Sequence, residues 1–121
     1  NAVFSMANEC LEKGKVTVWG EGSRMMQYIY MRDVISYILK AFSMDSSIYN
    51  LGSEEYISVA ESAKIIADFF KAKVIFLKDK KEGETLPFMD TAKLKRSSPT
   101  HITPFKDSLK EYLSLLRENF K

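Results

Sequence analysis

The sequence predicts an α+β fold, a small lobe of three or four helices with short strands. Two runs, Lys15–Trp19 and Gln27–Met31, have alternating β-branched or aromatic residues, which predicts half-buried strands. Stretches that begin near Val3, Val34 and Phe105 instead repeat apolar residues at helical spacing. A mixture of helices and short strands therefore explains the pattern.

Length and composition are those of one ordinary globular domain, residues 1–121, with 45% hydrophobic and 28% charged residues. Because the chain begins at Asn1 and not at methionine, we expect a fragment of a longer protein. No apolar run is long enough to cross a bilayer, so no membrane association is expected. A single cysteine, Cys10, excludes an intrachain disulfide and favours a reducing, cytoplasmic location.

A net charge of +2 gives little support to nucleic-acid binding. A weaker hypothesis would use a lysine-rich edge, which is better explained as a solvated surface: Lys71, Lys73, Lys78, Lys80 and Lys81. The only histidine, His101, lies in a predicted loop without a second ligand nearby, so no metal site is predicted.

Taken in order, the first helix should run from Val3 to a C-terminal cap at Gly14, with Cys10 on its buried face. Gly20 and Gly22 punctuate the turn between the first two strands. Trp19 is expected in the core, with stacking on a base as the less favoured alternative. Asp33 should be the N-cap of the next helix.

Further along, residues 48–53 predict a short buried strand. Ser58 and Glu61 form a capping box that begins a helix, followed by a strand at 74–77 and a charged loop at 78–85. A turn at 90–94 leads into a short helix. Thr103 and Pro104 predict the N-cap and first residue of the last helix, whose apolar face extends to Phe120.

Several of these stretches resemble the C-terminal region of extended short-chain dehydrogenases, the nucleotide-sugar epimerases and dehydratases. Residues 16–33, V-T-V-W-G-E-G-S-R-M-M-Q-Y-I-Y-M-R-D, resemble that family's V-x-V-x-G-x-G pattern. Residues 49–53 resemble its Y-N-[IL]-G-S, and residues 90–94 its D-x-[ST]-K-[AL]. Two features depart from the family: Met26 and Gln27 stand in place of Arg-Asp, and the usual L-G-W after Leu94 is missing.

The resemblance implies the substrate-binding part of an NAD(P)-dependent epimerase or dehydratase that acts on a UDP- or dTDP-sugar. In that family hydride passes to a bound nicotinamide and returns to the sugar. Val18, Trp19 and Gly20 are the candidate contacts to the base, with Arg24 and Lys81 near the diphosphate. Lys81 is chosen because residues 80–84, K-K-E-G-E, resemble the family's R-x-G-[DE]. The parent enzyme would be a cytoplasmic homodimer.

The chain itself lacks the motifs that the family uses for catalysis. A dinucleotide fingerprint would need a third glycine at Met25 and a helix behind the turn. No tyrosine is followed four residues later by lysine, so the Tyr-x-x-x-Lys pair is missing. We therefore predict no catalytic, cofactor-binding or metal residues here, and NAD or NADP bound only by the rest of the parent enzyme. The alternative is a non-catalytic binding or assembly module with the same fold, favoured by the two departures.

Overall fold

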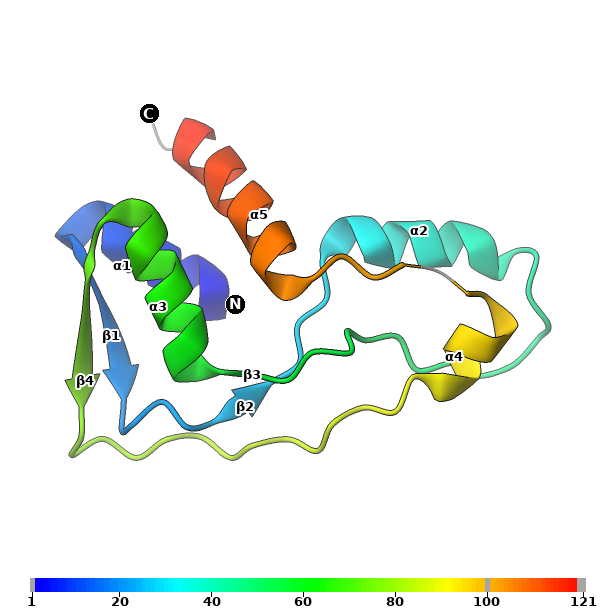
Figure 1. Ribbon diagram of the computed structural model, residues 1–121, viewed down its shortest axis with the longest axis horizontal. Helices are drawn as coiled ribbons and strands as arrows, with labels where there is room; N and C mark the ends of the chain where they lie inside the picture. The colour runs from blue at the N-terminus through cyan, green and yellow to red at the C-terminus, as the bar shows by residue number, and fades with distance from the viewer. Residues whose placement is uncertain (1, 100, 120–121) are drawn as a thin grey trace.

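A parallel pair of strands joins two distant parts of the chain in the computed structural model, which describes residues 2–99 and 101–119. Strand β1 (Lys15–Trp19) pairs with β4 (Lys73–Leu77), and Lys15 lies opposite Lys73. Each strand follows a helix: α1 (Ala2–Lys13) precedes β1, and α3 (Val59–Phe70) precedes β4. Figure 1 shows these helices and strands together at one end of an elongated molecule. The predicted strands at 15–19 and 74–77 are confirmed.

The core lies where α1, α3 and the last helix, α5 (Phe105–Asn119), pack with β1. Its fully buried members include Ala7, Val16, Ile66 and Leu113. Cys10 is buried among them, as predicted, and burial raises the pKa of its thiol to about 11. Gly14 ends α1 with φ +62°, and its N–H donates to the Cys10 carbonyl at 2.9 Å, which confirms the predicted cap.

The capping box of α3 is also confirmed. The Ser58 hydroxyl accepts a hydrogen bond from the Glu61 N–H at 3.1 Å, and the Glu61 carboxylate accepts from the Ser58 N–H at 3.1 Å. These reciprocal bonds satisfy two amides that would otherwise lack a partner at the helix start. They also hold the pKa of Glu61 below its usual value.

A second, antiparallel pair consists of β2 (Met25–Met26) and β3 (Ile57–Ser58). The predicted strand at 27–31 is wrong, because β2 ends before Gln27 and Met31 already begins helix α2 (Met31–Ala41). The residues between them cross the molecule in extended form, and Tyr28 stacks on Phe105 with ring centroids 4.9 Å apart. Side-chain contacts therefore replace strand pairing here.

Gln27 holds two crossing segments together through its side-chain amide. Its Nε2 donates to the Ser53 carbonyl at 2.5 Å and to the Met89 carbonyl at 3.2 Å. Its Oε1 accepts from the Met89 N–H at 2.9 Å. The amide thus uses both its donor and its acceptor, which a carboxylate at this position cannot do.

We expect Gln27→Glu to lower the free energy of unfolding by about 1–3 kcal/mol at pH 7, because two carbonyl groups would lose a donor and face a charge. Urea denaturation measures this difference. The loss should shrink below about pH 4, where a protonated glutamate can again donate. An equal loss at both pH values would contradict the role of the donor.

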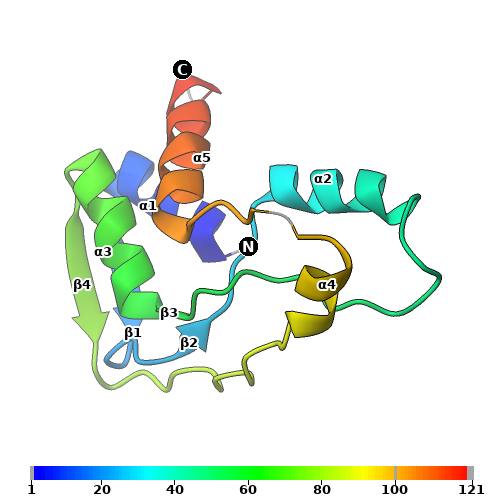
Figure 2. The same ribbon diagram turned by 45° about the vertical axis from the view of Figure 1, so that its right-hand side comes forward.

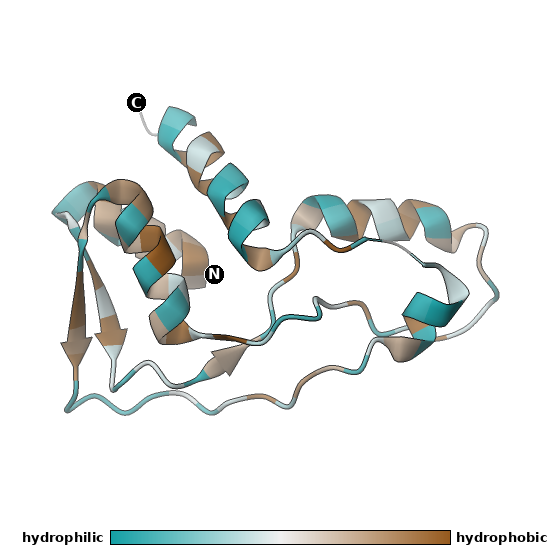
Figure 3. Ribbon diagram, in the orientation of Figure 1, coloured by the Kyte–Doolittle hydropathy of each residue, from teal (hydrophilic) through white to brown (hydrophobic). Residues whose placement is uncertain are grey.

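Helices α2 and α4 (Ala92–Ser97) lie at the other end of the molecule, and the turned view in Figure 2 shows the same separation from the core helices. The apolar stripe of α2 faces outward, and Figure 3 shows its hydrophobic segments. Its exposed members are Met31, Ile35, Ile38 and Leu39, and the exposed Phe42 follows as the C-cap. The short helix after the turn at 90–94 is confirmed as α4.

Asp33 is not the N-cap of α2. Tyr30 occupies that position without a side-chain cap, and Asp33 lies buried in the first turn. Its carboxylate accepts hydrogen bonds from the Thr103 N–H at 2.9 Å and the Thr103 hydroxyl at 3.0 Å. The carboxylate therefore fixes the segment that leads into α5, a partner that the local sequence does not reveal.

Two other boundaries also differ from the prediction. Helix α5 begins at Phe105, one residue after the predicted start at Pro104, and the Phe105 N–H donates to the Glu55 carboxylate. The predicted strand at 48–53 is wrong: Ile48 is 87% exposed, and no strand is found there among the described residues. Phe120, the predicted last residue of the apolar face of this helix, lies outside the described residues.

The α+β class with short strands is confirmed. The part of the chain that the structure describes has five helices, one more than the predicted three or four, because the six-residue α4 adds to four longer ones.

Candidate functional site

The candidate site lies where the parallel strands end. Residues 20–24, here called the 20–24 turn, follow β1, and residues 78–85, here called the 78–85 loop, follow β4. The two segments run next to each other below the strands in Figure 1. The carboxyl ends of parallel strands are where open α/β sheets bind ligands, so this edge is the natural place to look for a site.

The 20–24 turn is packed tightly against the start of α3. The Gly22 carbonyl accepts from the Ala60 N–H at 2.9 Å, and the Arg24 carbonyl accepts from the Val59 N–H at 2.9 Å. Gly22 has φ +69°, and a β-carbon there would lie 2.7 Å from Val18 Cγ1. This position therefore requires glycine for its conformation and for the space it occupies.

Glu82 ties the 78–85 loop to the turn. Its carboxylate accepts hydrogen bonds from the N–H groups of Glu21 and Arg24, both at 2.8 Å. The Ser23 hydroxyl donates to the same carboxylate at 3.2 Å. The hydrogen bond from the Arg24 N–H is the largest cause that lowers the pKa of Glu82. A second tie forms where the Met25 N–H donates to Thr85 Oγ1 at 3.0 Å.

A cavity of about 200 Å³ opens between these segments and the core. Val18, Trp19, Arg24, Tyr28 and Gly83 contribute to its lining. Arg24 Nε is buried and has no hydrogen-bond partner among residues 2–99 and 101–119. A buried donor without a partner is costly, so this atom marks where a ligand acceptor would be favourable.

Tyr28 brings a second polar group to the cavity. Its hydroxyl is buried near Ser62 but makes no hydrogen bond of good geometry within the described part of the chain. Burial raises the pKa of Tyr28, and the Ser62 hydroxyl and the Arg24 charge oppose this effect. The phenol is therefore neutral near pH 7 and can donate or accept a hydrogen bond.

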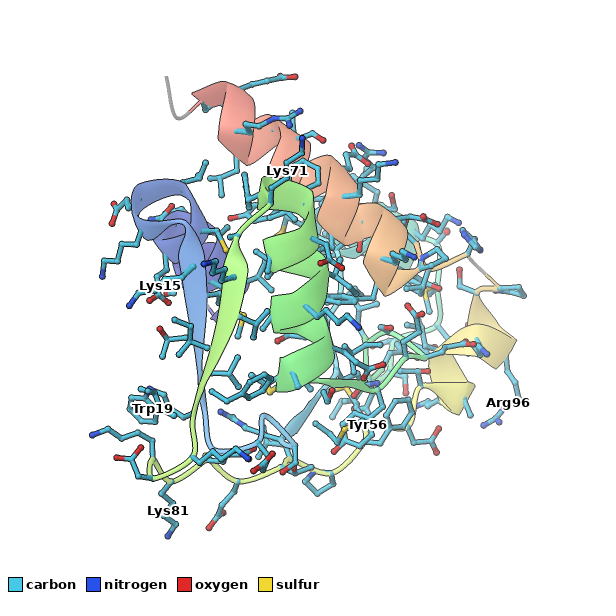
Figure 4. The ribbon with its side chains drawn as sticks, turned by 60° about the vertical axis from the view of Figure 1, so that its left-hand side comes forward. Lys15, Trp19, Tyr56, Lys71, Lys81 and Arg96 are labelled. Carbon is cyan, nitrogen blue, oxygen red and sulfur yellow. The ribbon has the colours of Figure 1, made fainter. Side chains whose placement is uncertain are left out.

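The structure brings three of the five predicted site residues together, because Val18, Trp19 and Arg24 all line the cavity. Gly20 directly follows Trp19 in the chain, and a β-carbon there would lie 2.5 Å from the Glu82 side chain. Lys81 does not line the cavity; Figure 4 shows its side chain pointing away from the strands. Trp19 is 60% exposed, so its expected place in the core is wrong.

Sequence reasoning missed Glu82, Tyr28 and Gly83 as parts of this site. The charged run at 80–84 gave no reason to prefer Glu82 over its neighbours, since only folding shows which carboxylate turns inward. Gly83 was a clearer signal. A β-carbon there would lie 2.9 Å from Arg24 Nη1, so the Arg24 side chain packs closely against this glycine.

The 20–24 turn is not a dinucleotide fingerprint. Such a fingerprint places a helix directly after the glycine turn, whereas β2 follows the 20–24 turn. Within the described ranges, no three His, Cys, Asp or Glu side chains gather to hold a metal ion. No described helix is both long and apolar enough to cross a bilayer.

Comparison with known proteins supports the resemblance drawn from the motifs. Residues 1–52 match the family model described as NAD dependent epimerase/dehydratase family. A GDP-L-fucose synthase from Dictyostelium discoideum is 29% identical over 113 residues, which cover 88% of this chain and 35% of the relative. The chain thus spans about a third of that relative's length.

Solved structures show the same fold. A GDP-L-fucose synthetase from Naegleria fowleri matches 99% of this chain and 40% of its own, with a TM-score of 0.86 and 23% identity. A UDP-glucose 4-epimerase from Thermotoga maritima, solved with UDP-glucose, matches all of this chain and 40% of its own, with a TM-score of 0.83 and 19% identity.

The chain therefore shares its fold with these enzymes. Its first 52 residues are similar to the NAD dependent epimerase/dehydratase family, and most of the chain is similar to a GDP-L-fucose synthase.

Proposed function

We propose that this chain is the nucleotide-sugar-binding, C-terminal part of an NAD(P)-dependent sugar epimerase, dehydratase or related enzyme. The observation that carries the proposal is the cavity at the end of β1, where Arg24 Nε is buried without a partner in the described structure. A guanidinium with a free buried N–H favours a phosphate oxygen, with which it forms strong, charge-assisted hydrogen bonds.

The other lining groups suit the rest of a nucleotide. Trp19 exposes an aromatic surface at the cavity edge, which could stack on a base, and Tyr28 offers a neutral hydroxyl. At about 200 Å³ the cavity is smaller than typical small-molecule pockets of roughly 300–1,000 Å³, so it would hold one portion of a nucleotide sugar. The sugar and the reaction would then lie outside it.

In this proposal the rest of the parent enzyme supplies the dinucleotide site and the acid and base groups. The match to only about a third of a GDP-L-fucose synthase supports a longer parent. So does the exposed apolar stripe of α2, which would be covered by further chain. The structural relatives include one bound to NADP and one in complex with NAD. We extend the proposal to a cytoplasmic homodimer that uses NAD or NADP.

Calorimetric titration of the chain with GDP-, UDP- and dTDP-sugars tests the proposal. The relatives' names make the GDP-sugars the first choice, although the sequence motifs alone suggested UDP or dTDP. We expect Arg24→Ala to weaken binding of the preferred nucleotide sugar by about 10-fold or more, since charged hydrogen bonds contribute roughly 1.5–3 kcal/mol.

Arg96→Ala is the matched control, because it removes the same charge from an exposed arginine on α4, far from Trp19 in Figure 4. It should change the affinity less than twofold. Equal binding by the wild type and Arg24→Ala would contradict the proposed phosphate contact. If the chain binds none of these nucleotides, the non-catalytic binding or assembly module becomes the better explanation.

A further inference from the structure

The environment of Glu82 resembles that of a bound anion more than that of an ordinary surface glutamate. Its carboxylate receives hydrogen bonds from two backbone N–H groups of the 20–24 turn and from the Ser23 hydroxyl. Exposed carboxylates usually interact with water or with lysine and arginine side chains. Converging backbone N–H groups in a turn form a concave anion-binding site called a nest.

The turn is built to point these groups inward. Gly20 and Gly22 have φ +62° and +69°, so two left-handed residues flank Glu21, whose φ is negative. Gly20 also leaves room for the carboxylate, because a β-carbon there would lie 2.7 Å from Glu82 Oε1. The turn is fixed independently of Glu82 by the Ala60 and Val59 N–H groups that donate to it from α3. The donors should therefore stay in place when the carboxylate is removed.

We propose that the 20–24 turn is an oxyanion-binding site that the chain's own Glu82 occupies, and that a free carboxylate or phosphate group can take its place. Glu82 is then a built-in competitor for the site. The glutamate is held on the same chain at high effective concentration, so a free anion enters readily only when Glu82 is removed or displaced. This inference uses backbone donors and does not depend on the nucleotide-sugar proposal.

The groups that hold the carboxylate indicate which anion the turn would accept. Glu82 forms no ion pair among the described residues, although Gly83 packs against the Arg24 side chain. Lys78, in the same loop, contacts the Glu21 carboxylate at 3.5 Å on the exposed surface. Donors from the backbone and one hydroxyl favour a single oxyanion group over a larger polyanion.

Chemical rescue of Glu82→Ala tests this inference. Thermal unfolding is measured for the wild type, Glu82→Ala and Glu84→Ala in sodium chloride and in sodium formate at equal ionic strength. Glu84→Ala removes the same charge two residues away, from an exposed side chain. If formate binds the emptied turn with a Kd of about 10 mM, 100 mM formate raises the Tm of Glu82→Ala by roughly 5 °C more than that of the other two.

An equal change in Tm for all three proteins would overturn the inference and leave Glu82 as a tie between two loops. Repeating the measurement in sodium phosphate separates the two ligand classes. A selective rise in both salts shows that the site accepts phosphate and carboxylate, and a rise in formate alone limits it to carboxylate. Because sulfate and phosphate stabilise folded proteins generally, only the difference from Glu84→Ala counts.

A second variant serves if Glu82→Ala does not fold in chloride. Glu82→Gln keeps the size of the side chain and an acceptor oxygen but removes the charge, so it competes less strongly for the N–H donors. The amide signals of Glu21 and Arg24 are then followed by NMR during titration with formate. Saturable shifts at both amides in this variant, and none in the wild type, support the inference. Shifts that are absent or do not saturate overturn it.

Discussion

Replacing Leu113 by alanine should lower the free energy of unfolding by about 2–5 kcal/mol. Leu113 is fully buried on α5, where it packs into the core that α1, α3 and β1 share. The substitution removes three carbon atoms, so the folded protein loses the free energy gained by transferring them out of water. It also leaves a cavity in a close-packed interior. Urea denaturation of the chain measures the change.

Leu115→Ala is the matched control, because Leu115 lies on the same helix but is 49% exposed. The substitution removes the same atoms and changes helix propensity equally, so the two variants differ mainly in burial. We expect a loss of about 1 kcal/mol or less for Leu115→Ala. Similar losses for both variants would show that α5 does not pack on the core as described.

Gly22→Ala should lower the free energy of unfolding by about 2–5 kcal/mol, which combines left-handed backbone strain of roughly 1–2 kcal/mol with overpacking of roughly 1–3 kcal/mol. A β-carbon at residue 22 would lie 2.7 Å from Val18 Cγ1 and 2.9 Å from the backbone nitrogen of Ala60. Neither neighbour can move easily, because one is a buried strand residue and the other is backbone at the start of α3.

Gly14→Ala separates the two contributions. Gly14 has φ +62°, close to that of Gly22, but a β-carbon there would have nothing within 4 Å. Only the strain of about 1–2 kcal/mol is therefore expected. Guanidinium denaturation compares the two variants, and a Gly22→Ala loss no larger than that of Gly14→Ala would show that the turn has room to adjust.

Features that depend on neighbours in sequence were predictable. The capping box of Ser58 and Glu61 and the glycine cap of α1 need only residues within one helical turn. Strand β1 was also found with its full bounds, because its alternating β-branched residues match its alternating burial. In these elements local preference and tertiary packing agree, so the sequence pattern is sufficient.

Features that depend on distant partners were not predictable. Asp33 is of a residue type that N-caps favour and lies near the start of a helix, yet its carboxylate accepts hydrogen bonds from Thr103. The run after β2 alternates like a strand, but the Gln27 side chain binds Ser53 and Met89. Nothing in the local sequence identifies a partner tens of residues away. The predicted strand at 48–53 failed for a related reason, since an apolar run indicates burial without showing what would cover it.

The candidate site shows the same division. Val18, Trp19 and Arg24 were predicted because they belong to one motif-like stretch, and the structure places them in one cavity. Tyr28 follows β2, and Glu82 follows β4, which pairs with β1. Their places at the cavity depend on tertiary structure, which the spacing of residues in the sequence does not show. The sequence shows that residues 80–84 are charged. It does not show which of them faces the 20–24 turn, and in the structure that residue is Glu82 and not Lys81.

The parallel pairing of β1 with β4 also constrains the order in which the chain can fold. Parallel strands cannot be joined by a tight hairpin. Strand β1 can therefore pair only when β4, which is more than fifty residues away in sequence, reaches it, as the pairing of Lys15 with Lys73 shows. Helix α1 and β1 can meet early, because they are adjacent in sequence, whereas the sheet requires closure of a long loop that contains α2, β3 and α3. Because Glu82 and Gly83 follow β4, the lining of the cavity at the end of β1 is complete only once β4 has paired with β1.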